Sequence, residues 1–428
     1  MTSEESNKFA TGNHTLLFAL SCGVVMIHFV FSRAFRDSLL QNGLPIRSLP
    51  SLIIIGTLCS LVLSFVLSWL FKRFDRATVL PLAYIVMGVG EFFLSLGLLP
   101  QNLARQAFYV LISVSTATGL SLVWLRASDW FSNQPELKER AVPRLLASGT
   151  AGGLLAGFGL VHLHFATNFS NANIILALLN FTTAALLFTY RPEPEKQDRV
   201  ESSTSTTRRE KRNYMVIMML AGTTILGATA STLLDLTYRV SAAERYHSQQ
   251  ELLHFFGFMQ ALLGVAAVFA QLGLWKWQPS GDRRYMMAMY ALGGCAAAVL
   301  TAIVPSFALL TAMRTGEYAM RNSLFRFGTE MTYAELPNHL RQQTRPVVDI
   351  VGERIGDSLA AGLLQLLLFI NSSLPLRLVL VCLAGVALLL WMVCERMMRI
   401  PLRRRQLKRK EEEDSMLLYA SAEEGKNA

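Results

Sequence analysis

The stretch RPEPEKQDRVESSTSTTRREKR, residues 191–212, divides this chain into two parts of similar length. It is charged, rich in Ser and Thr and free of apolar periodicity, which is typical of a flexible linker. Long apolar segments lie on both sides of it, about six on each side by the length criterion for a spanning helix. We therefore expect a six-helix bundle over residues 1–190, a second over 213–400, and a polar tail over 401–428.

The composition is that of an integral membrane protein. Of the 428 residues, 52% are hydrophobic and 16% are charged, whereas a soluble domain carries about 25% charged residues. A membrane-spanning helix needs about 20 mostly apolar residues. The chain has about twelve such stretches: 15–40, 50–71, 77–98, 105–130, 143–167, 172–190, 213–238, 251–275, 285–304, 306–330, 346–370 and 376–397.

The basic residues predict the orientation of the chain in the membrane. Cytoplasmic loops carry an excess of Lys and Arg. Residues 72–76, 138–144, the linker 191–212 and the tail 401–428 are all basic, and all would lie on the side of the N-terminus. We therefore expect both termini in the cytoplasm. The net charge of +10 then follows from topology, and we expect no nucleic-acid partner.

No pattern in the sequence indicates an enzyme. The five cysteines lie singly in apolar segments, without the spacing of a metal site or a disulfide framework. The chain has no glycine-rich phosphate loop of the kind that ATP-driven pumps use, and no cluster of His, Asp and Glu at catalytic spacing. We expect no enzymatic activity, no cofactor and no metal. His28 and His254 lie in apolar segments and could carry protons near neutral pH, although a hydrogen-bonded structural histidine is commoner.

Charged residues recur in the first, fourth, seventh and tenth apolar segments. A charge inside a bilayer costs roughly 2.5–3.5 kcal/mol on insertion scales, so it needs a partner or a polar cavity. The same feature at every third segment predicts helices that line a shared aqueous pathway, which is typical of a transporter. The residues are Arg33, Arg36 and Asp37; Arg126 and Asp129; Asp235 and Arg239; and Arg314, Glu317 and Arg321.

Spacing predicts how some of these charges pair. Arg33 and Asp37 are four residues apart and would share a helical face. That pairing leaves Arg36 to meet a substrate or the other bundle, although arginines near a membrane interface can also extend into water. Asp235 and Arg239 repeat the spacing in the second bundle with the signs reversed. This correspondence favours a functional role for both pairs.

In the fourth segment, Arg126 and Asp129 are flanked by Trp124 and Trp130. Two interpretations remain open there. The tryptophans could belong to the aromatic belt at a membrane interface, or the two charges could serve a binding site or a gate.

The tenth segment carries the strongest cationic stripe. Arg314, Glu317 and Arg321 follow helical spacing, with Tyr318 beside them. Two arginines against one glutamate leave an excess of positive charge. The planar guanidinium group suits phosphate and carboxylate groups. We therefore predict a net-positive cavity that selects an anion.

The eleventh segment opens with RQQTRPVVDIVGERIGDS, residues 341–358, in which Arg345 and Asp349 are four apart. This charge could contact a ligand, but we favour a latch at a cytoplasmic gate. Gly352 and Gly356 form a small-residue face that allows another helix to come close.

Two motifs resemble the nucleotide transporters of the ATP/ADP translocase type. Arg36-Asp37-Ser38-Leu39 is similar to the Lys-Asp-Ser/Thr-Leu of that family, and RPVVDIVGERIG at 345–356 resembles its Lys-x-x-Val-Asp-Val-Val-Gly-x-Arg-x-Gly signature. The resemblance implies a major-facilitator-like fold and exchange of nucleotides across a membrane. The chain departs from the family at Ser113, where an acidic residue is expected, and at Asp357, where a lysine is expected.

We predict an all-α membrane protein with a major facilitator-type fold that works by alternating access. It would be a secondary transporter of an organic anion, above all a nucleotide or related phosphorylated metabolite, by exchange or by proton coupling. We expect a monomer in the bilayer of a bacterial inner membrane. The alternatives are a proton-coupled transporter of an unrelated solute (a peptide, cell-wall fragment or drug) and a transport-dead membrane sensor or scaffold.

The predicted roles are three. Substrate contacts are Arg36, Arg126, Arg239, Arg314, Arg321 and Tyr318; charge-balancing or proton-carrying residues are Asp37, Asp235 and Glu317; and gate residues are Asp129, Arg345, Asp349, Glu353 and Arg354.

Overall fold

The computed structural model describes most of the two predicted bundles. The described residues are 3–41, 48–131, 135–162, 168–189, 207–276, 285–334, 336, 340, 344–345, 347–370 and 378–396. Of the predicted linker 191–212, residues 191–206 lie outside them, as does the predicted tail 401–428. Residues 207–212, which were predicted to be flexible, are instead helical.

The described residues are helical throughout and contain no strand. The first group of helices comprises α1 (Ser3–Ser38), α2 (Leu49–Arg73), α3 (Arg76–Ser95), α4 (Gln101–Phe131), α5 (Pro135–His162) and α6 (Phe169–Phe188), with a short 3₁₀ turn η1 (Leu39–Gln41) after α1. The second comprises α7 (Thr207–Arg245), α8 (Gln249–Lys276), α9 (Tyr285–Ile303), α10 (Phe307–Met320), η4 (Arg321–Phe325), α11 (Arg326–Ala334), η5 (Val347–Val351), α13 (Gly352–Ile370) and a last helix, Leu378–Arg396.

The all-α fold with about twelve helices, predicted from the apolar segments, is confirmed. Because α10, η4 and α11 follow one another without a break, they form a single span, and η5 likewise continues into α13. Among the described residues, 9 helices are long and apolar enough to cross a membrane.

Polar side chains cap several helices where apolar segments begin. The Asp75 carboxylate accepts a hydrogen bond from the Ala77 amide at 3.1 Å, which starts α3 directly after the basic turn at 72–76. Asn168 caps α6, and Ser306 caps α10 after the break at Pro305. These side chains satisfy amide groups that the helix itself leaves unpaired. Short polar turns therefore separate long antiparallel helices.

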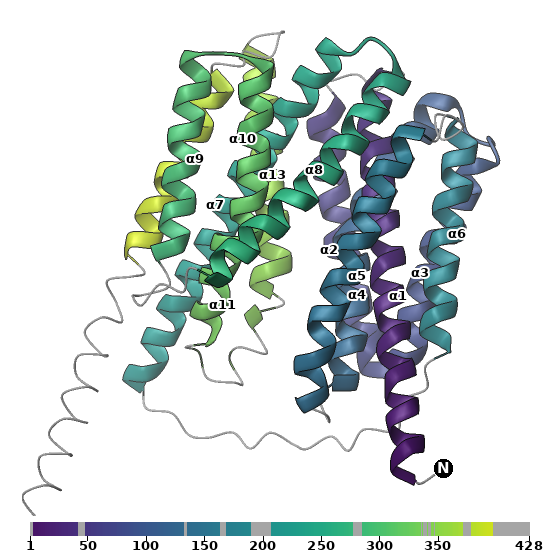
Figure 1. Ribbon diagram of the computed structural model, residues 1–428. Helices are drawn as coiled ribbons and strands as arrows, with labels where there is room; N and C mark the ends of the chain where they lie inside the picture. The colour runs from purple at the N-terminus through teal and green to yellow at the C-terminus, as the bar shows by residue number, and fades with distance from the viewer. Residues whose placement is uncertain are drawn as a thin grey trace, which may run out of the picture.

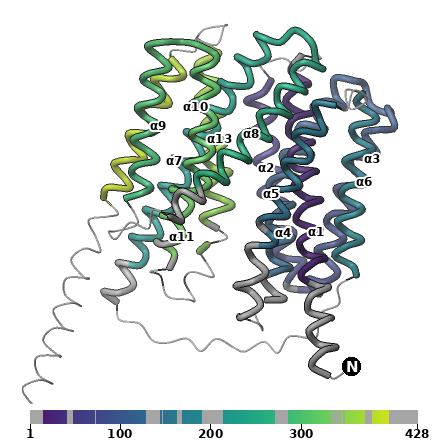
Figure 2. Tube along the Cα trace, in the orientation of Figure 1, coloured from purple at the N-terminus to yellow at the C-terminus, as the bar shows by residue number. Residues whose placement is uncertain are grey.

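The two groups of helices stand side by side. In Figure 1, α1–α6 lie at the right and α9, α10, α13 and the last helix at the left, with α8 leaning across between them. The Cα trace in Figure 2 follows the same division. We call the end where α1 finishes the outer end and the opposite end the inner end, following the predicted topology.

The two groups share an apolar core only at the outer end, so far as the described residues go. One cluster joins Phe35 and Phe108 of the first group to Leu234, Tyr238 and Leu252 of the second. At the inner end each group has its own clusters, one around α1, α3 and α4 and two others within the second group. The structure is therefore sealed at the outer end by apolar contacts that the inner end lacks.

Glycines bring the helices into close contact at this seal and within each group. A Cβ atom on Gly157 of α5 would lie 2.8 Å from the Gly257 carbonyl oxygen of α8, across the two groups. A Cβ atom on Gly356 of α13 would lie 2.5 Å from the Ile225 carbonyl oxygen of α7. Gly352 also faces α7, so the small-residue face predicted for this helix does meet a neighbouring helix.

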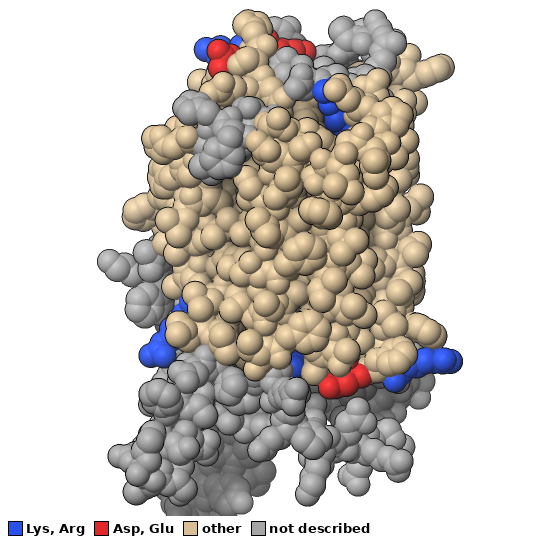
Figure 3. All heavy atoms as spheres, turned by 90° about the vertical axis from the view of Figure 1, so that its right-hand side faces the viewer, with Lys and Arg blue, Asp and Glu red and all other residues tan. Residues whose placement is uncertain are grey.

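The outer surface is apolar over a broad band. In the face shown in Figure 3, charged side chains gather at the two ends, and the middle is almost free of them. Large apolar side chains such as Phe65, Met218 and Phe269 are about 70% exposed. A soluble protein rarely exposes apolar patches on this scale. The chain is an integral membrane protein.

Candidate functional site

A polar cavity of about 450 Å³ lies between the two groups of helices. Side chains of α1, α2 and α4 line one wall, and side chains of α7, α10, η4 and α13 line the other. The charged lining residues are Arg33, Arg36, Arg239, Arg314, Arg321 and Arg354, with Asp235, Glu353 and Asp357. Six arginines therefore face three carboxylates in this wall. The excess of positive charge falls to one when Asp37 and Glu317, which pair with these arginines, are included.

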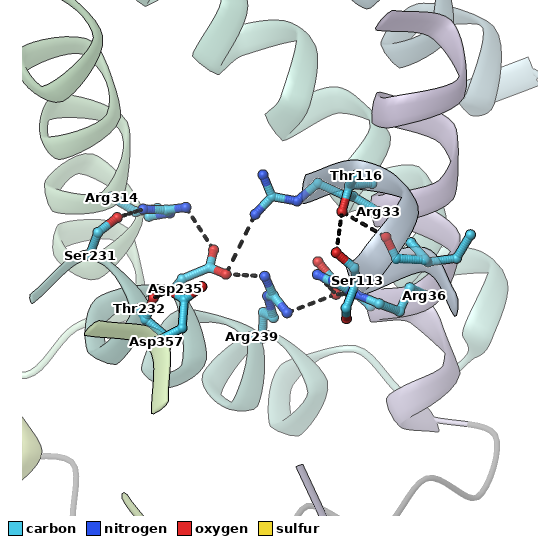
Figure 4. Close-up of polar contacts among 12 residues, drawn as sticks. Arg33, Arg36, Ser113, Thr116, Ser231, Thr232, Asp235, Arg239, Arg314 and Asp357 are labelled. Atoms are coloured by element: carbon cyan, nitrogen blue, oxygen red, sulfur yellow. Dashed lines mark hydrogen bonds and ion pairs between the residues drawn. The ribbon is translucent and has the colours of Figure 1, made fainter. Parts of the chain in front are cut away.

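Two ion pairs cross from one group of helices to the other. Asp37 Oδ1 of α1 lies 3.0 Å from Arg239 Nη1 of α7, and both side chains are buried. Arg33 Nη2 of α1 lies 3.8 Å from Asp235 Oδ2 of α7. Figure 4 shows Arg33 and Arg239 pointing toward Asp235 across the cavity. Both pairs lie near the ends of α1 and α7 that form the shared outer core, so they tie the two groups together there.

The pairing predicted for α1 from sequence spacing is wrong. Asp37 pairs with its neighbour Arg36, whose Nη2 lies 2.9 Å from Oδ1, and with Arg239, whereas Arg33 reaches Asp235. The physical reason is that partners from α7 are close enough to compete with a same-helix partner. The Arg36 guanidinium also lies over the Tyr109 ring at 4.9 Å, a contact that adds cation–π attraction.

Asp235 is surrounded by cations. It pairs with Arg239 on its own helix, as the spacing of four predicts, and with Arg314 Nη2 of α10 at 2.7 Å. Arg33 is its third cationic neighbour. A single carboxylate therefore holds arginines from three helices. Arg239 and Arg314 each have a second carboxylate partner, which is Asp37 for Arg239 and Glu317 for Arg314.

Glu317 balances Arg314 from the side of α10. Its Oε2 lies 2.5 Å from Arg314 Nη1, and the Tyr290 hydroxyl of α9 donates to its Oε1 at 2.9 Å. Arg314 Nη1 also lies 3.4 Å from Ser231 Oγ. The predicted stripe on this helix is present, but one of its arginines is held by carboxylates on both sides. Tyr318 lines the cavity beside it.

Arg321 marks a change in helix geometry. It is the first residue of η4, a π-helical turn in which the Arg326 amide reaches back to the Arg321 carbonyl. Such a turn adds one residue to the helix and turns the following side chains, and it often accompanies a functional site. Arg321 Nη2 lies 3.1 Å from Glu353 Oε1, and about a quarter of its side chain stays exposed. It is the most exposed of the six arginines that line the cavity.

Both positions that depart from the family pattern line the cavity. Ser113 of α4 is in the wall and donates to the Tyr109 carbonyl at 2.7 Å. Asp357 of α13 pairs with Arg354 at 2.9 Å and accepts from the Thr232 hydroxyl at 2.5 Å. The wall therefore carries a neutral hydroxyl at Ser113 and a carboxylate at Asp357.

Three predicted site residues, Arg126, Arg345 and Asp349, lie outside the cavity wall. Arg126 is buried near the inner end of α4 and is absent from the residues that line the cavity. The side chain of Asp129 is outside the described residues. Arg345 and Asp349 belong to a network at the inner end of the second group, where Arg345 reaches Glu330 at 2.5 Å and Asp349 at 3.7 Å.

This inner network stays within one group of helices. Among the described residues, none of its ion pairs reaches the first group. The Tyr333 hydroxyl adds a hydrogen bond of 2.7 Å to Asp349. Glu353 and Arg354, also predicted at the gate, line the cavity instead. A role in a gate stays a prediction for all four residues: Arg345, Asp349, Glu353 and Arg354.

Sequence reasoning missed several residues at or near the site. The spacing predicts that Arg33 pairs with Asp37, and the contact of Arg33 with α7 was therefore missed. No spacing separates three further residues from other polar residues in apolar segments: Tyr109, Thr232 and Tyr290. Glu91 did carry one, because it is a lone carboxylate in the third apolar segment, and it is fully buried.

Comparison with known proteins gives the fold. No family model matches the chain, and no curated protein matches it. Solved structures do match: the nucleoside transporter NupG has a TM-score of 0.67 at 12% identity, with 90% of this chain and 99% of that chain covered. The chain has a major facilitator-type fold.

Two further solved structures agree with this fold. A bacterial homolog of the human lysosomal transporter Spinster has a TM-score of 0.63 at 14% identity, over 91% of this chain and 97% of that chain. The POT family transporter PepTSo has a TM-score of 0.66 at 12% identity, over 90% of this chain and 98% of that chain. The predicted fold class is thereby confirmed, whereas none of these neighbours is named as an ATP/ADP translocase. At such identities the likeness establishes the fold alone.

Proposed function

We propose that this protein is a secondary transporter that moves an organic anion by alternating access. The observation that carries the proposal is the cavity between the two groups of helices, in which six arginines face three carboxylates. A buried charge needs a partner, and arginine is the side chain best suited to phosphate and carboxylate groups. An anion that enters the cavity would take up the excess positive charge.

The volume of the cavity supports a nucleotide or a related phosphorylated metabolite as the substrate. Its volume of about 450 Å³ falls in the range of sites for drug-sized ligands, about 300–1,000 Å³. Phe29, Tyr109 and Tyr318 line it together with the arginines, so an aromatic base could stack while phosphates meet guanidinium groups. We propose Arg36, Arg239, Arg314 and Arg321 as anion contacts and add Arg33.

Arg33 has the weakest ion pair of these arginines. Its nearest carboxylate oxygen is 3.8 Å away, and one fifth of its side chain is exposed. The Phe29 ring lies 5.1 Å from its guanidinium carbon. It could therefore turn toward a ligand with little loss. Asp37, Asp235 and Glu317 would hold the cation cluster together when the cavity is empty.

The two groups of helices would move against each other as bundles. We propose residues 1–190 and 213–400 as these units, and 191–212 as the linker that lets them move. The shared outer core, with its two crossing ion pairs, corresponds to a state closed at the outer end and separable at the inner end. We further propose a monomer in a bacterial inner membrane.

Binding and exchange test this proposal. The purified protein would be screened by thermal shift against ATP, ADP, sugar phosphates, dicarboxylates and uncharged nucleosides, and each stabilising compound would be tested for exchange in liposomes. We expect stabilisation by phosphorylated anions and none by uncharged nucleosides. Arg321→Ala should weaken both binding and exchange by at least about tenfold, the effect of about 1.4 kcal/mol.

Arg73→Ala is the matched control, because Arg73 is exposed at the end of α2, stacks on Trp69 and is not among the residues that line the cavity. It should leave binding unchanged. If Arg321→Ala binds and exchanges anions as well as the unmodified protein, the cationic cavity is not the site. Stabilisation by none of the anions would end the nucleotide hypothesis.

A further inference from the structure

A second buried polar cluster lies in the first group of helices, apart from the charged lining of the cavity. His28 Nε2 of α1 lies 2.8 Å from Glu91 Oε1 of α3. The Asn180 amide of α6 donates to Glu91 Oε2 at 2.8 Å and lies 3.1 Å from His28 Nε2. Glu91 is 0% exposed, His28 5% and Asn180 2%. Three helices thus bring a carboxyl, an imidazole and an amide together in the interior.

The charge of this cluster depends on protons. Within the described residues, no Lys or Arg forms an ion pair with Glu91; its partner is His28. A buried carboxylate without a positive partner is strongly unfavourable. Glu91 must therefore share at least one proton with His28, either as carboxylate and imidazolium or as carboxylic acid and neutral imidazole.

The contacts fit both arrangements of that proton. If Nε2 carries it, the imidazole donates to Glu91 and cannot accept from Asn180. If Glu91 carries it, Oε1 donates to Nε2, and the Asn180 amide still has Oε2 as an acceptor. Since Oε2 accepts from Asn180 in either case, the carboxyl group keeps its position while the proton moves along the 2.8 Å contact. The shared proton can thus move between His28 and Glu91 while the contact of Asn180 with Oε2 is kept.

The cluster has a route to the charged cavity. A small cavity of about 10 Å³ is lined by His28, Tyr84, Thr116 and Asn180, among others. That volume is close to the minimum for one water molecule, and the polar lining offers the partners that a buried water needs. Thr116, Phe29 and Leu120 line this small cavity and also the charged cavity. A single water and the Thr116 hydroxyl would therefore bridge His28 to the transport pathway.

The neighbouring helices bring few other titratable groups. Tyr84 of α3 lines the same small cavity, and its hydroxyl donates to the Gly119 carbonyl of α4. Cys22 packs in the same apolar cluster as Tyr84. From α4 come the hydroxyls of Ser115 and Thr116, and from α6 comes the Asn180 amide. The nearest arginines along α1, Arg33 and Arg36, line the charged cavity. Among the described residues of this cluster, His28 and Glu91 are consequently the two titratable side chains that a direct hydrogen bond joins.

We propose that His28 and Glu91 form a proton-binding site that couples proton movement to transport. The coupling part rests on the proposed transport of an anion, whereas proton binding itself does not. On exposure to the cavity, Glu91 Oε2 takes up a second proton while His28 Nε2–H donates to Oε1, and the Asn180 amide turns so that its oxygen accepts from Oε2. The positive charge of the pair is then balanced by the anion in the cavity, and the shared-proton state returns when the proton leaves. For each coupled proton, a gradient of one pH unit would support up to about tenfold accumulation of substrate.

Proton binding is tested first, without any substrate. Infrared difference spectra of the purified full-length protein would be recorded between about pH 8 and pH 5. We expect a carboxylic-acid C=O band at the acidic end that is missing in Glu91→Gln, which keeps an acceptor for Asn180, and shifted in His28→Gln. His254→Gln, in α8, should leave the spectrum unchanged. A spectrum that is the same in Glu91→Gln as in the unmodified protein would overturn the proposal.

Coupling is tested in liposomes with ATP as the probe. We expect an alkaline lumen to drive accumulation of ATP by the unmodified protein, and this accumulation to be lost in Glu91→Gln while ATP/ATP exchange persists. Accumulation that is equal in both would overturn the coupling role. If the unmodified protein neither binds nor exchanges any phosphorylated anion, the proposed function fails, and the infrared result still decides whether the pair binds a proton.

Discussion

Neutralising Asp37 should open the outer end of the protein. The Asp37–Arg239 pair, with 3.0 Å between Oδ1 and Nη1, crosses between the two groups of helices, and both side chains are buried. At an effective dielectric constant of about 20, two unit charges at this distance attract by about 5 kcal/mol before desolvation is counted. Breaking a buried pair costs about 3–5 kcal/mol. Asp37→Asn removes the attraction and keeps the size of the side chain.

The net effect should be smaller than those figures. Arg239 keeps Asp235 on its own helix, so its charge is not left without a partner. The lost contact of Asp37 with Arg36 lies within α1 and is present whether the outer end is open or closed, so it does not change that balance. We therefore expect Asp37→Asn to destabilise the closed state of the outer end, relative to the open state, by about 2 kcal/mol. This is less than the full cost of breaking a buried ion pair. This shifts the equilibrium toward the outward-open state by about 30-fold.

Cysteine labelling measures this shift. Ala242 is fully buried in the shared outer core, so Ala242→Cys in a background without the native cysteines should react slowly with an impermeant maleimide added outside. Asp37→Asn should raise the labelling rate by about 30-fold. Glu251→Gln is the matched control, because it makes the same chemical change at an exposed position of the same end.

A double-mutant cycle makes the test sharper. If the ion pair holds the outer end closed, the effects of Asp37→Asn and Arg239→Gln on the closing free energy should not be additive. The coupling energy between the two substitutions should be about 2 kcal/mol. An unchanged labelling rate in folded Asp37→Asn protein would refute the reasoning, as would full additivity of the two substitutions.

Three further predictions concern packing, a hydrogen bond and the charge of the cavity. Gly157→Val should raise the outer labelling rate, because its side chain would meet the backbone of α8 across the seal. Gly356→Val would meet α7 within one group, so it should lower the melting temperature without raising the labelling rate. The reverse pattern would contradict the assignment of the seal. Tyr290→Phe removes the donor to Glu317 and should destabilise the protein by about 1.5–3 kcal/mol, measured by denaturant unfolding in detergent; an unchanged midpoint would show that this bond contributes nothing. Asp357→Asn removes a negative charge from the cavity wall and should tighten ATP binding by about fivefold, or about 1 kcal/mol, in a titration; weaker binding would argue against an anion site.

The local part of the site could be predicted from the sequence. Asp235 and Arg239 pair as their spacing predicts, and so do Arg314 and Glu317. Helical periodicity fixes which residues of one helix share a face, so such contacts need no knowledge of the rest of the chain. Arg33 and Asp37 have the same spacing and do not pair. Partners on another helix outcompeted the local one, and spacing alone does not reveal them.

The longer-range contacts could not be predicted in this way. Glu91 is 63 residues from His28 and 89 from Asn180, yet the three side chains form one cluster. No periodicity links residues on different helices, because their contact depends on how each helix is rotated and tilted against its neighbours. In the sequence, Glu91 is a single carboxylate in an apolar segment. This predicts that it has a polar partner but does not predict which residue the partner is.

The sequence by itself determined that the chain crosses a membrane, in about twelve helices, with charges that a bilayer does not tolerate alone. Those properties depend on composition and on the length of apolar segments, and the cost of burying a charge is the same in any fold. The tertiary structure decided which charges meet: Asp37 with Arg239 across the two groups of helices, and His28 with Glu91 within one. It also decided that Ser113 and Asp357 face the same cavity, because only the arrangement of the two groups of helices places α4 opposite α7 and α13.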